Sequence, residues 1–246
     1  MVKILSKPPK RLGNPESLFS GVVRIPIDSI ELEAEWIMPP GAKGISIFAH
    51  GSGSSRHSRR NQFVAAILRE AGIGTVLMDL LSREEERRDS LDGSMRFDIE
   101  FLTERLIAAT RWIQSHPVAQ EHRIGYFGAS TGGAAAIAAA SILDGAVSAV
   151  VSRGGRPDLA WEHLPLVMAP TLLIVGQRDA AVLKLNEEAY QCLRCPKKMA
   201  VIPGATHLFE EPGALEKVAN LAAGWFQHHL SVINPTTELT QHTSIP

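Results

Sequence analysis

The chain has 246 residues, with 25 lysines and arginines against 26 aspartates and glutamates, so its formal net charge is −1. This balance provides no broad basic field and argues against nucleic acid or an anionic membrane as a partner. With 45% hydrophobic and 21% charged residues, the composition is that of a globular protein with a sizeable core, not of a disordered or fibrous chain.

Two further features of the composition bear on where the protein works. The only cysteines, Cys192 and Cys195, are too few for a disulfide framework, and we interpret them as reduced thiols without a metal or redox role. No apolar segment has the length of a signal peptide core or of a membrane span. We therefore expect a protein of the cytoplasm.

Short β-branched apolar runs alternate along the chain with longer segments of helical periodicity. The sequence predicts eight strands, over residues 21–27, 30–38, 44–49, 74–79, 123–127, 146–152, 171–175 and 198–202. It predicts helices over residues 61–71, 97–115, 132–143, 157–163, 183–192 and 216–230. This alternation is typical of an α/β fold, in which helices cover both faces of a mostly parallel sheet that begins with an antiparallel pair.

The same patterns predict how the chain is divided. Residues 1–20 form an irregular lead-in, residues 21–230 the α/β domain, and residues 231–246 a loose tail. The charged run over residues 83–89 is interpreted as a solvated connector. Neither terminal segment is expected to carry chemistry.

The residues that follow each strand at the carboxyl edge of a parallel sheet are the place to look for chemistry. After the fifth predicted strand, Gly128 and Gly132 flank Ser130 at a spacing of two residues. A serine on a sharp strand-to-helix turn has a strained backbone, and side chains two residues away on either side would collide. The N–H of Thr131 would then start the next helix, where it can stabilise an oxyanion. The motif predicts a nucleophile elbow, with a Gly/Ser turn that only packs helix against sheet as the alternative.

A serine hydroxyl needs a neutral imidazole to take its proton and a carboxylate to orient that imidazole. Asp179 follows the seventh strand and His207 the eighth, in the order serine, acid, histidine that this architecture requires. Asp158, after the sixth strand, and Asp79, after the fourth, are rival acids. The sequence thus predicts a triad of Ser130, Asp179 and His207.

The loop after the third strand begins with His50 and Gly51, followed by Ser52 and Gly53. Its glycines let the backbone approach a substrate carbonyl, so we predict the N–H of Ser52 as the second oxyanion donor. Gly53 is the next choice and a candidate substrate contact. The spacing fits neither a phosphate-binding loop nor a dinucleotide fingerprint, and no nucleotide is expected.

Arginines follow two of the strand ends: Arg153 and Arg156 after the sixth strand, and Arg56, Arg59 and Arg60 after the third. They could line the mouth of the site and attract a substrate carboxylate. Ion pairs with Asp158 or contact with solvent explain them equally well, so both interpretations stay open.

With these motifs the chain resembles the α/β-hydrolase superfamily and, within it, the dienelactone hydrolase family. The resemblance covers about residues 20–230 and rests on the segments 50–53, 128–133, 173–179 and 204–207. It implies an eight-stranded sheet, the triad named above, no cofactor, and hydrolysis of carboxylic esters or lactones. The enzymes that gave the family its name carry cysteine where this chain has Ser130, so the dienelactone substrate itself is not implied.

Between the sixth and seventh strands there is room for little more than one short helix, so we expect a minimal cap or none. An open site of this kind suits small to medium-sized esters. We therefore predict a serine hydrolase that acts on such esters or lactones through an acyl-enzyme, without a metal. Acyl transfer or amide cleavage by the same triad, and a non-catalytic binding module, are the alternatives. The residues make no prediction of an oligomeric state.

Overall fold

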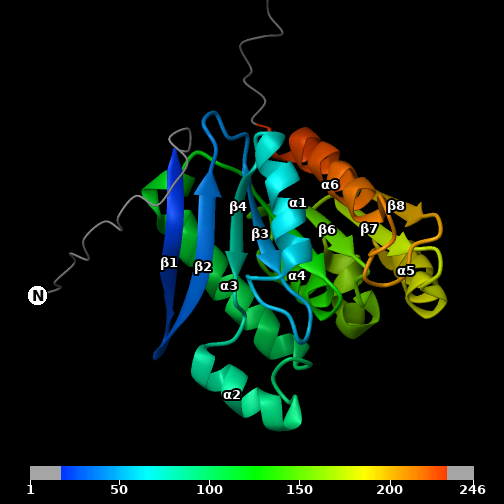
Figure 1. Cartoon of the computed structure of the whole chain (residues 1–246), viewed down its shortest axis with the longest axis horizontal. Coiled ribbons are helices and arrows are strands. Elements are labelled where there is room, and N and C mark those ends of the chain that lie inside the picture. The colour runs from blue at the N-terminus through cyan, green and yellow to red at the C-terminus, as the bar shows by residue number, and fades with distance from the viewer. Residues whose placement is uncertain (1–17, 232–246) are drawn as a thin grey trace, which may run out of the picture.

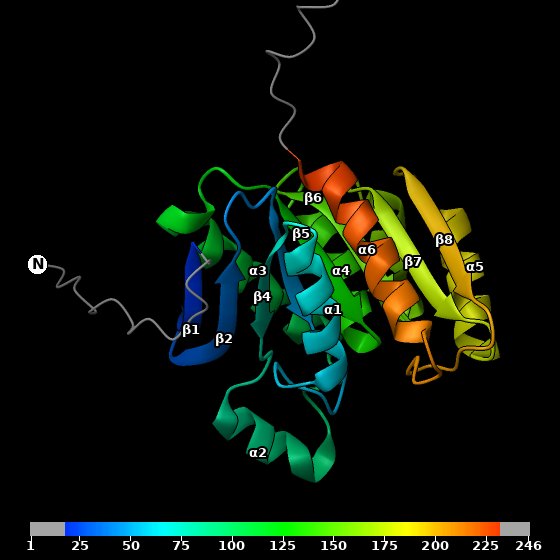
Figure 2. The same ribbon diagram turned by 45° about the horizontal axis from the view of Figure 1, so that its top comes forward.

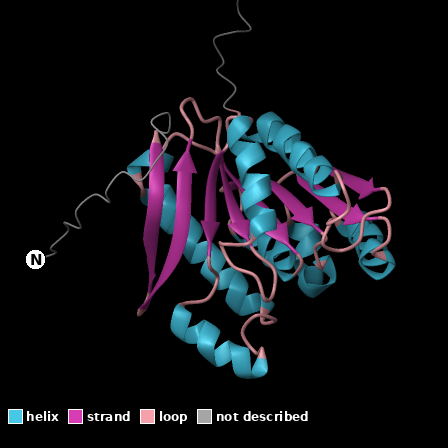
Figure 3. Ribbon diagram, in the orientation of Figure 1, coloured by secondary structure: helices cyan, strands magenta, loops and turns pink. Residues whose placement is uncertain are grey.

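A computed structural model describes residues 18–231, and every structural statement below concerns this part of the chain. Its centre is an eight-stranded sheet with the order β1-β2-β4-β3-β5-β6-β7-β8 (Figures 1 and 3). The strands are β1 (Phe19–Ile27), β2 (Ile30–Met38), β3 (Ile45–Ala49), β4 (Gly74–Met78), β5 (Ile124–Ala129), β6 (Val147–Arg153), β7 (Thr171–Gly176) and β8 (Lys197–Ile202). β2 pairs antiparallel with β1 and with β4, and the other neighbouring strands are parallel. The sheet that the sequence predicts is confirmed.

Helices cover both faces of this sheet. They are α1 (Arg59–Glu70), α2 (Arg83–Asp92), α3 (Ile99–Ser115), α4 (Thr131–Ile142), α5 (Ala180–Cys192) and α6 (Ala214–Leu230), with the shorter 3-10 segments η1 (Pro117–Ala119) and η2 (Pro157–Leu166). α1 and α6 lie side by side on one face, in front of the sheet in Figures 1 and 2. α3, α4, α5 and η2 pack on the other face.

The central strands are apolar throughout because both of their faces are covered. Every residue of β3, β4 and β5 is buried, whereas β2 alternates between buried and partly exposed positions. One apolar cluster lies between the sheet and α3 and α4, and a second lies beneath α1 and α6. The catalytic prediction depends on this rigid sheet, because its carboxyl edge fixes where the strand-end loops lie.

The charged run over residues 83–89 is a helix, and the prediction of a connector was wrong. α2 begins with a capping box: the Ser82 side chain accepts from the Glu85 N–H, and the Glu85 carboxylate accepts from the Ser82 N–H. Arg105 of α3 donates to Glu85 at 2.6 Å and ties the helix to the body of the fold. α2 lies beyond the carboxyl end of β4, at the bottom of Figure 1.

The remaining boundaries follow the sequence closely. β1 begins at Phe19, so the last residues of the predicted lead-in are strand, while residues 1–17 lie outside the described residues. The predicted tail lies outside them too, from residue 232 onward. η2 is the only helical segment between β6 and β7, as expected for a fold without a cap there. Both cysteines are free thiols, and within residues 18–231 no helix has the length and apolar character to cross a membrane.

Candidate active site

Ser130 sits at the turn between β5 and α4 in a conformation that L-residues rarely adopt. Its φ is 51° and its ψ is −121°. A Cβ on Gly128 would lie 2.5 Å from the carbonyl oxygen of Gly132, and a Cβ on Gly132 would lie 2.2 Å from that of Ala49. Only glycine fits at these two positions. The structure therefore gives Ser130 the geometry that a nucleophile elbow needs.

Asp179 and His207 come from consecutive strand-end loops and contact each other directly. Asp179 follows β7 as the first residue before α5, and His207 lies in the loop after β8. The Nδ1 of His207 and the Oδ2 of Asp179 are 2.6 Å apart. In this pair Nδ1–H donates to the carboxylate, which leaves Nε2 as the acceptor that a general base needs.

The end of β6 connects this pair to Ser130. The N–H of Ser130 donates to the carbonyl of Arg153 at 3.3 Å. The next residue, Gly154, lies against the His207 ring, since a Cβ at Gly154 would be 3.4 Å from its Nδ1 and Cε1 atoms. Gly154 has a positive φ of 51°, which favours glycine. Ser130 and His207 thus both border the turn formed by Arg153 and Gly154.

The rival acids are engaged elsewhere. Asp79 accepts from the Arg56 N–H at 2.8 Å and forms an ion pair with the same side chain. Asp158 accepts from Nε and Nη2 of Arg156 at 2.8 and 2.7 Å. Asp179 is the carboxylate that contacts the candidate base. The bidentate pair also accounts for Arg156, whose pKa is raised by its hydrogen bond with Asp158.

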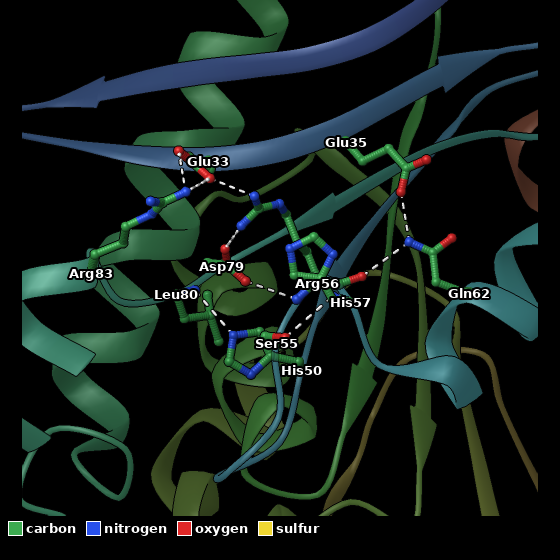
Figure 4. Close-up of polar contacts among 10 residues, drawn as sticks. All are labelled: Glu33, Glu35, His50, Ser55, Arg56, His57, Gln62, Asp79, Leu80 and Arg83. Carbon is green, nitrogen blue, oxygen red and sulfur yellow. Dashed lines mark hydrogen bonds and ion pairs between the residues drawn. The ribbon is translucent and has the colours of Figure 1, made fainter. Parts of the chain in front are cut away.

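Arg56 anchors the loop after β3 to the antiparallel edge of the sheet (Figure 4). Its guanidinium bridges Asp79, after β4, and Glu33 on β2. Arg83, at the start of α2, also contacts Glu33 at 3.2 Å. The two ion pairs of Arg56 are partly buried, so they hold the loop more firmly than exposed pairs would, whereas the Arg83 side chain is exposed.

His50 fixes the beginning of the same loop. Its Nε2 accepts from the Leu80 N–H at 3.1 Å, so the proton resides on Nδ1, which donates to the carbonyl of Gly51 at 2.9 Å. Burial lowers the pKa of His50 and keeps the ring neutral. Figure 4 shows the ring reaching toward Leu80. His50 thereby joins the loop after β3 to the loop after β4.

Ser52 and Thr131, the two residues predicted to donate to the oxyanion, are hydrogen-bonded to each other. Thr131 begins α4, and its side chain is buried. The Ser52 N–H, predicted to be free for substrate, instead donates to the Thr131 Oγ1 at 2.9 Å. Gly53 has a positive φ of 70° and open space around it. Ser52 therefore lies where predicted, but its N–H already has an acceptor.

A cavity of about 170 Å³ opens next to this contact. The loop after β3 and Thr131 form one side of it, and α2 with the segments before and after it forms the other. The lining from the second side consists of Leu80, Leu81, Glu86, Asp89, Ser90, Arg96 and Leu102. Asp89 accepts from the backbone N–H groups of Met95 and Arg96 and pairs with the Arg96 side chain, which closes the far end of α2.

Arg153 lies at the end of β6, where its side chain is 8% exposed. Its Nε and Nη1 atoms have no hydrogen-bond partner within the described residues. Burial, and next to it the charge of Arg60, lower the pKa of Arg153 to about 10. The two arginines that the sequence places after β6 therefore differ, because Arg156 has a carboxylate partner.

Residues 37–235 match the model of the dienelactone hydrolase family. The chain belongs to the dienelactone hydrolase family. Both the family and the α/β-hydrolase fold that the sequence predicts are thereby confirmed. This member resembles the crystal structure of a dienelactone hydrolase from Anabaena variabilis with 51% identity and a TM-score of 0.85, over 87% of this chain and 99% of that one. The fold and family are those of hydrolases.

Other relatives of this dienelactone hydrolase family member are more distant or longer. Est1E from Butyrivibrio proteoclasticus shares its fold, with 18% identity and a TM-score of 0.72 over 85% of this chain and 99% of that one. A Mycobacterium tuberculosis protein, named provisionally as a phosphoribosyl transferase, is 50% identical over 214 residues, which are 87% of this chain and 47% of that protein. The chain thus spans about half the length of this curated relative.

The sequence did not reveal two parts of the site in this family member. The cavity wall on α2 was missed because a run of mixed charges is typical of solvated surface. Two signals could have indicated it: Ser82 and Glu85 have the spacing of a capping box, and α2 follows β4 at the carboxyl edge of the sheet. The contact of Ser52 with Thr131 joins residues 79 positions apart, and neither residue type signals it. Within the described residues no group of His, Cys, Asp and Glu could hold a metal ion.

Proposed function

We propose that this protein is a serine hydrolase that cleaves small to medium-sized carboxylic esters or lactones through an acyl-enzyme. Two observations support the proposal: the strained backbone of Ser130, and the contact of 2.6 Å between His207 and Asp179. A backbone strain of this kind costs free energy and persists where the surrounding structure enforces it, as at active sites. Family membership supports the same reaction class.

In the proposed reaction, the Nε2 of His207 takes the proton of Ser130 while the serine oxygen attacks the ester carbonyl. Asp179 orients the ring through Nδ1–H and stabilises the imidazolium that forms. His207 then gives the proton to the departing alcohol, leaving Ser130 acylated. Water, deprotonated by the same ring, releases the acid and restores the serine.

Thr131 supplies the oxyanion site in this proposal. Its backbone N–H lies at the amino end of α4, as predicted, where the helix dipole adds to the hydrogen bond. Its hydroxyl accepts from Ser52, so the hydroxyl's own hydrogen is left to donate. Within residues 18–231 that hydrogen has no acceptor. Ser52 thus acts through Thr131 rather than on the substrate.

The cavity beside Thr131 receives the acyl group, with Gly53 on its rim. Its volume of about 170 Å³ is below the roughly 300–1,000 Å³ of pockets that hold drug-sized ligands. Short acyl chains should therefore be preferred. This preference, the carboxylic ester specificity and the cytoplasmic location remain predictions.

A panel of esters and lactones of increasing acyl length tests the proposal, run beside a Ser130→Ala control. Hydrolysis should be fastest for short chains and absent in the variant. Product analysis with added alcohols and amines separates hydrolysis from acyl transfer, and an amide of the same acid tests amide cleavage. Activity that survives in Ser130→Ala would contradict the proposal, and no turnover of any substrate would favour a binding module.

A further inference from the structure

Arg153 is a buried cation without a counterion. It is the last residue of β6 and pairs in register with Ala129 of β5 and Ile174 of β7, so it lies at the carboxyl end of a strand with parallel neighbours on both sides. Ile174 belongs to the apolar cluster beneath α1 and α6, which places the guanidinium on that face. Two of its three nitrogens, Nε and Nη1, are buried without a partner. Native structures leave few buried polar atoms unpaired, and a bound ion or water commonly satisfies those that no protein group does.

The charges around Arg153 make the lack of a partner more costly. No carboxylate within residues 18–231 forms an ion pair with it. The charge that acts on it is another cation, Arg60. A buried ion without an opposite charge destabilises the folded state, and a neighbouring like charge adds to this.

Arg60, in the first turn of α1, is also only partly satisfied by hydrogen bonds. Its Nη1 donates to Glu210 at 3.0 Å, but that carboxylate is 64% exposed. Its Nε is buried and unpartnered. The first turn of α1 contains no acidic residue, so the partial positive charge of the helix end is not offset either. Two guanidiniums and a helix amino end therefore create one positive region, which among the described residues has only the largely exposed Glu210 as an ion-pair partner.

We propose that Arg153 and Arg60 bind a small oxyanion, a phosphate or carboxylate group, on the α1 face of the sheet behind Ser130. Guanidinium nitrogens match the oxygens of such groups in geometry and charge. The site is separate from the acyl cavity, which neither arginine lines. It adjoins the elbow, because the Arg153 carbonyl accepts from the Ser130 N–H.

The anion can come from solution or from an acidic group on the substrate, and two measurements separate these sources. The first is thermal unfolding of the full chain in inorganic phosphate against chloride of equal ionic strength. Phosphate should raise the Tm of the wild type by about 5 °C or more at a hundred times its Kd. Arg153→Met should abolish this rise, whereas Arg156→Met, whose arginine is already paired, should keep it.

The same experiment also compares the Tm of Arg153→Met with that of the wild type in chloride. Arg153→Met removes an unpaired buried charge, so in chloride its Tm should equal or exceed that of the wild type. Arg60→Gln should weaken phosphate binding about tenfold without abolishing it. A large fall in the Tm of Arg153→Met in chloride would overturn the proposal, because it would mean that the arginine is already satisfied.

The second measurement rests on the proposed hydrolase function. It compares KM for an ester that bears a free carboxylate with KM for its neutral methylated counterpart. A lower KM for the acid that disappears in Arg153→Met would assign the anion to the substrate. If Arg153→Met changes neither the phosphate-induced rise in Tm nor the difference in KM between the two esters, the site does not exist. An absence of turnover would refute only the hydrolase proposal, because the Tm measurement needs no activity.

Discussion

A substitution at Thr131 can separate the catalytic role of its hydroxyl from its structural role. Thr131→Val keeps the shape of the side chain and removes the oxygen that accepts from Ser52 at 2.9 Å. In the proposed mechanism this also removes a donor to the oxyanion. The loss of one such donor lowers kcat by about 100- to 1,000-fold. KM should change little, because the bond is made mainly in the transition state.

The same change leaves the Ser52 N–H without its acceptor. Because that N–H is only partly buried, water can replace part of the bond, and the free energy of unfolding should fall by about 1 kcal/mol. Urea unfolding measures this loss. A stability change of this size cannot explain a 100-fold fall in kcat, so the two effects are separable.

Thr131→Ser is the matched control, since it keeps the hydroxyl and loses only a methyl group. It should retain kcat to within about tenfold, which is less than the loss of one donor. The assay is steady-state hydrolysis of a short-chain aryl ester over a range of concentrations. A Thr131→Val variant with the kcat of the wild type would refute the reasoning, and Ser52 would then contact the substrate directly.

Three further changes test other parts of the structure. Asp179→Asn should lower kcat by about 10⁴-fold at nearly unchanged stability, as the equivalent change does in serine proteases, and a small effect would remove Asp179 from the triad. Gly132→Ala, which forces a Cβ to within 2.2 Å of a backbone oxygen, should lower the free energy of unfolding by about 3 kcal/mol, whereas Gly224→Ala, on an open face of α6, should raise it by about 0.5–1 kcal/mol. Equal effects in urea unfolding would contradict the packing of the elbow. Because burial lowers the pKa of His50 in the folded chain, the unfolded chain binds that proton first as pH falls below about 6.5, so stability is lost toward acid by up to about 1.4 kcal/mol per pH unit. His50→Gln should lose less stability between neutral and acidic pH than the wild type, and an unchanged slope would show that His50 does not contribute.

The parts of the fold that local patterns specify could be predicted from the sequence. β3 and β5 are short, largely apolar runs, and their burial on both faces follows from that composition. The turn at Ser130 was readable because Gly128 and Gly132 have a steric reason to be there. The proximity of Asp179 and His207 followed from the rule that parallel strands end at one edge.

Side-chain contacts that the strand-end rule does not specify could not be predicted. Arg153 and Arg156 stand three positions apart in the sequence, yet one is buried and unpaired and the other is held by Asp158. Arg153 is the last residue of β6 and Arg156 lies beyond it, and a sequence pattern locates the end of a strand only approximately. The hydrogen bond from Ser52 to Thr131 likewise depends on the approach of two loops.

Covalent labelling tests the central claim most directly. A fluorophosphonate reacts only with a serine whose hydroxyl is activated by a nearby base, and mass spectrometry of the digested protein locates the modified residue. The account predicts one adduct, on the peptide that contains Ser130, which Ser130→Ala abolishes and Asp179→Asn slows strongly. An unlabelled wild-type protein, or an adduct on any other residue, would contradict it.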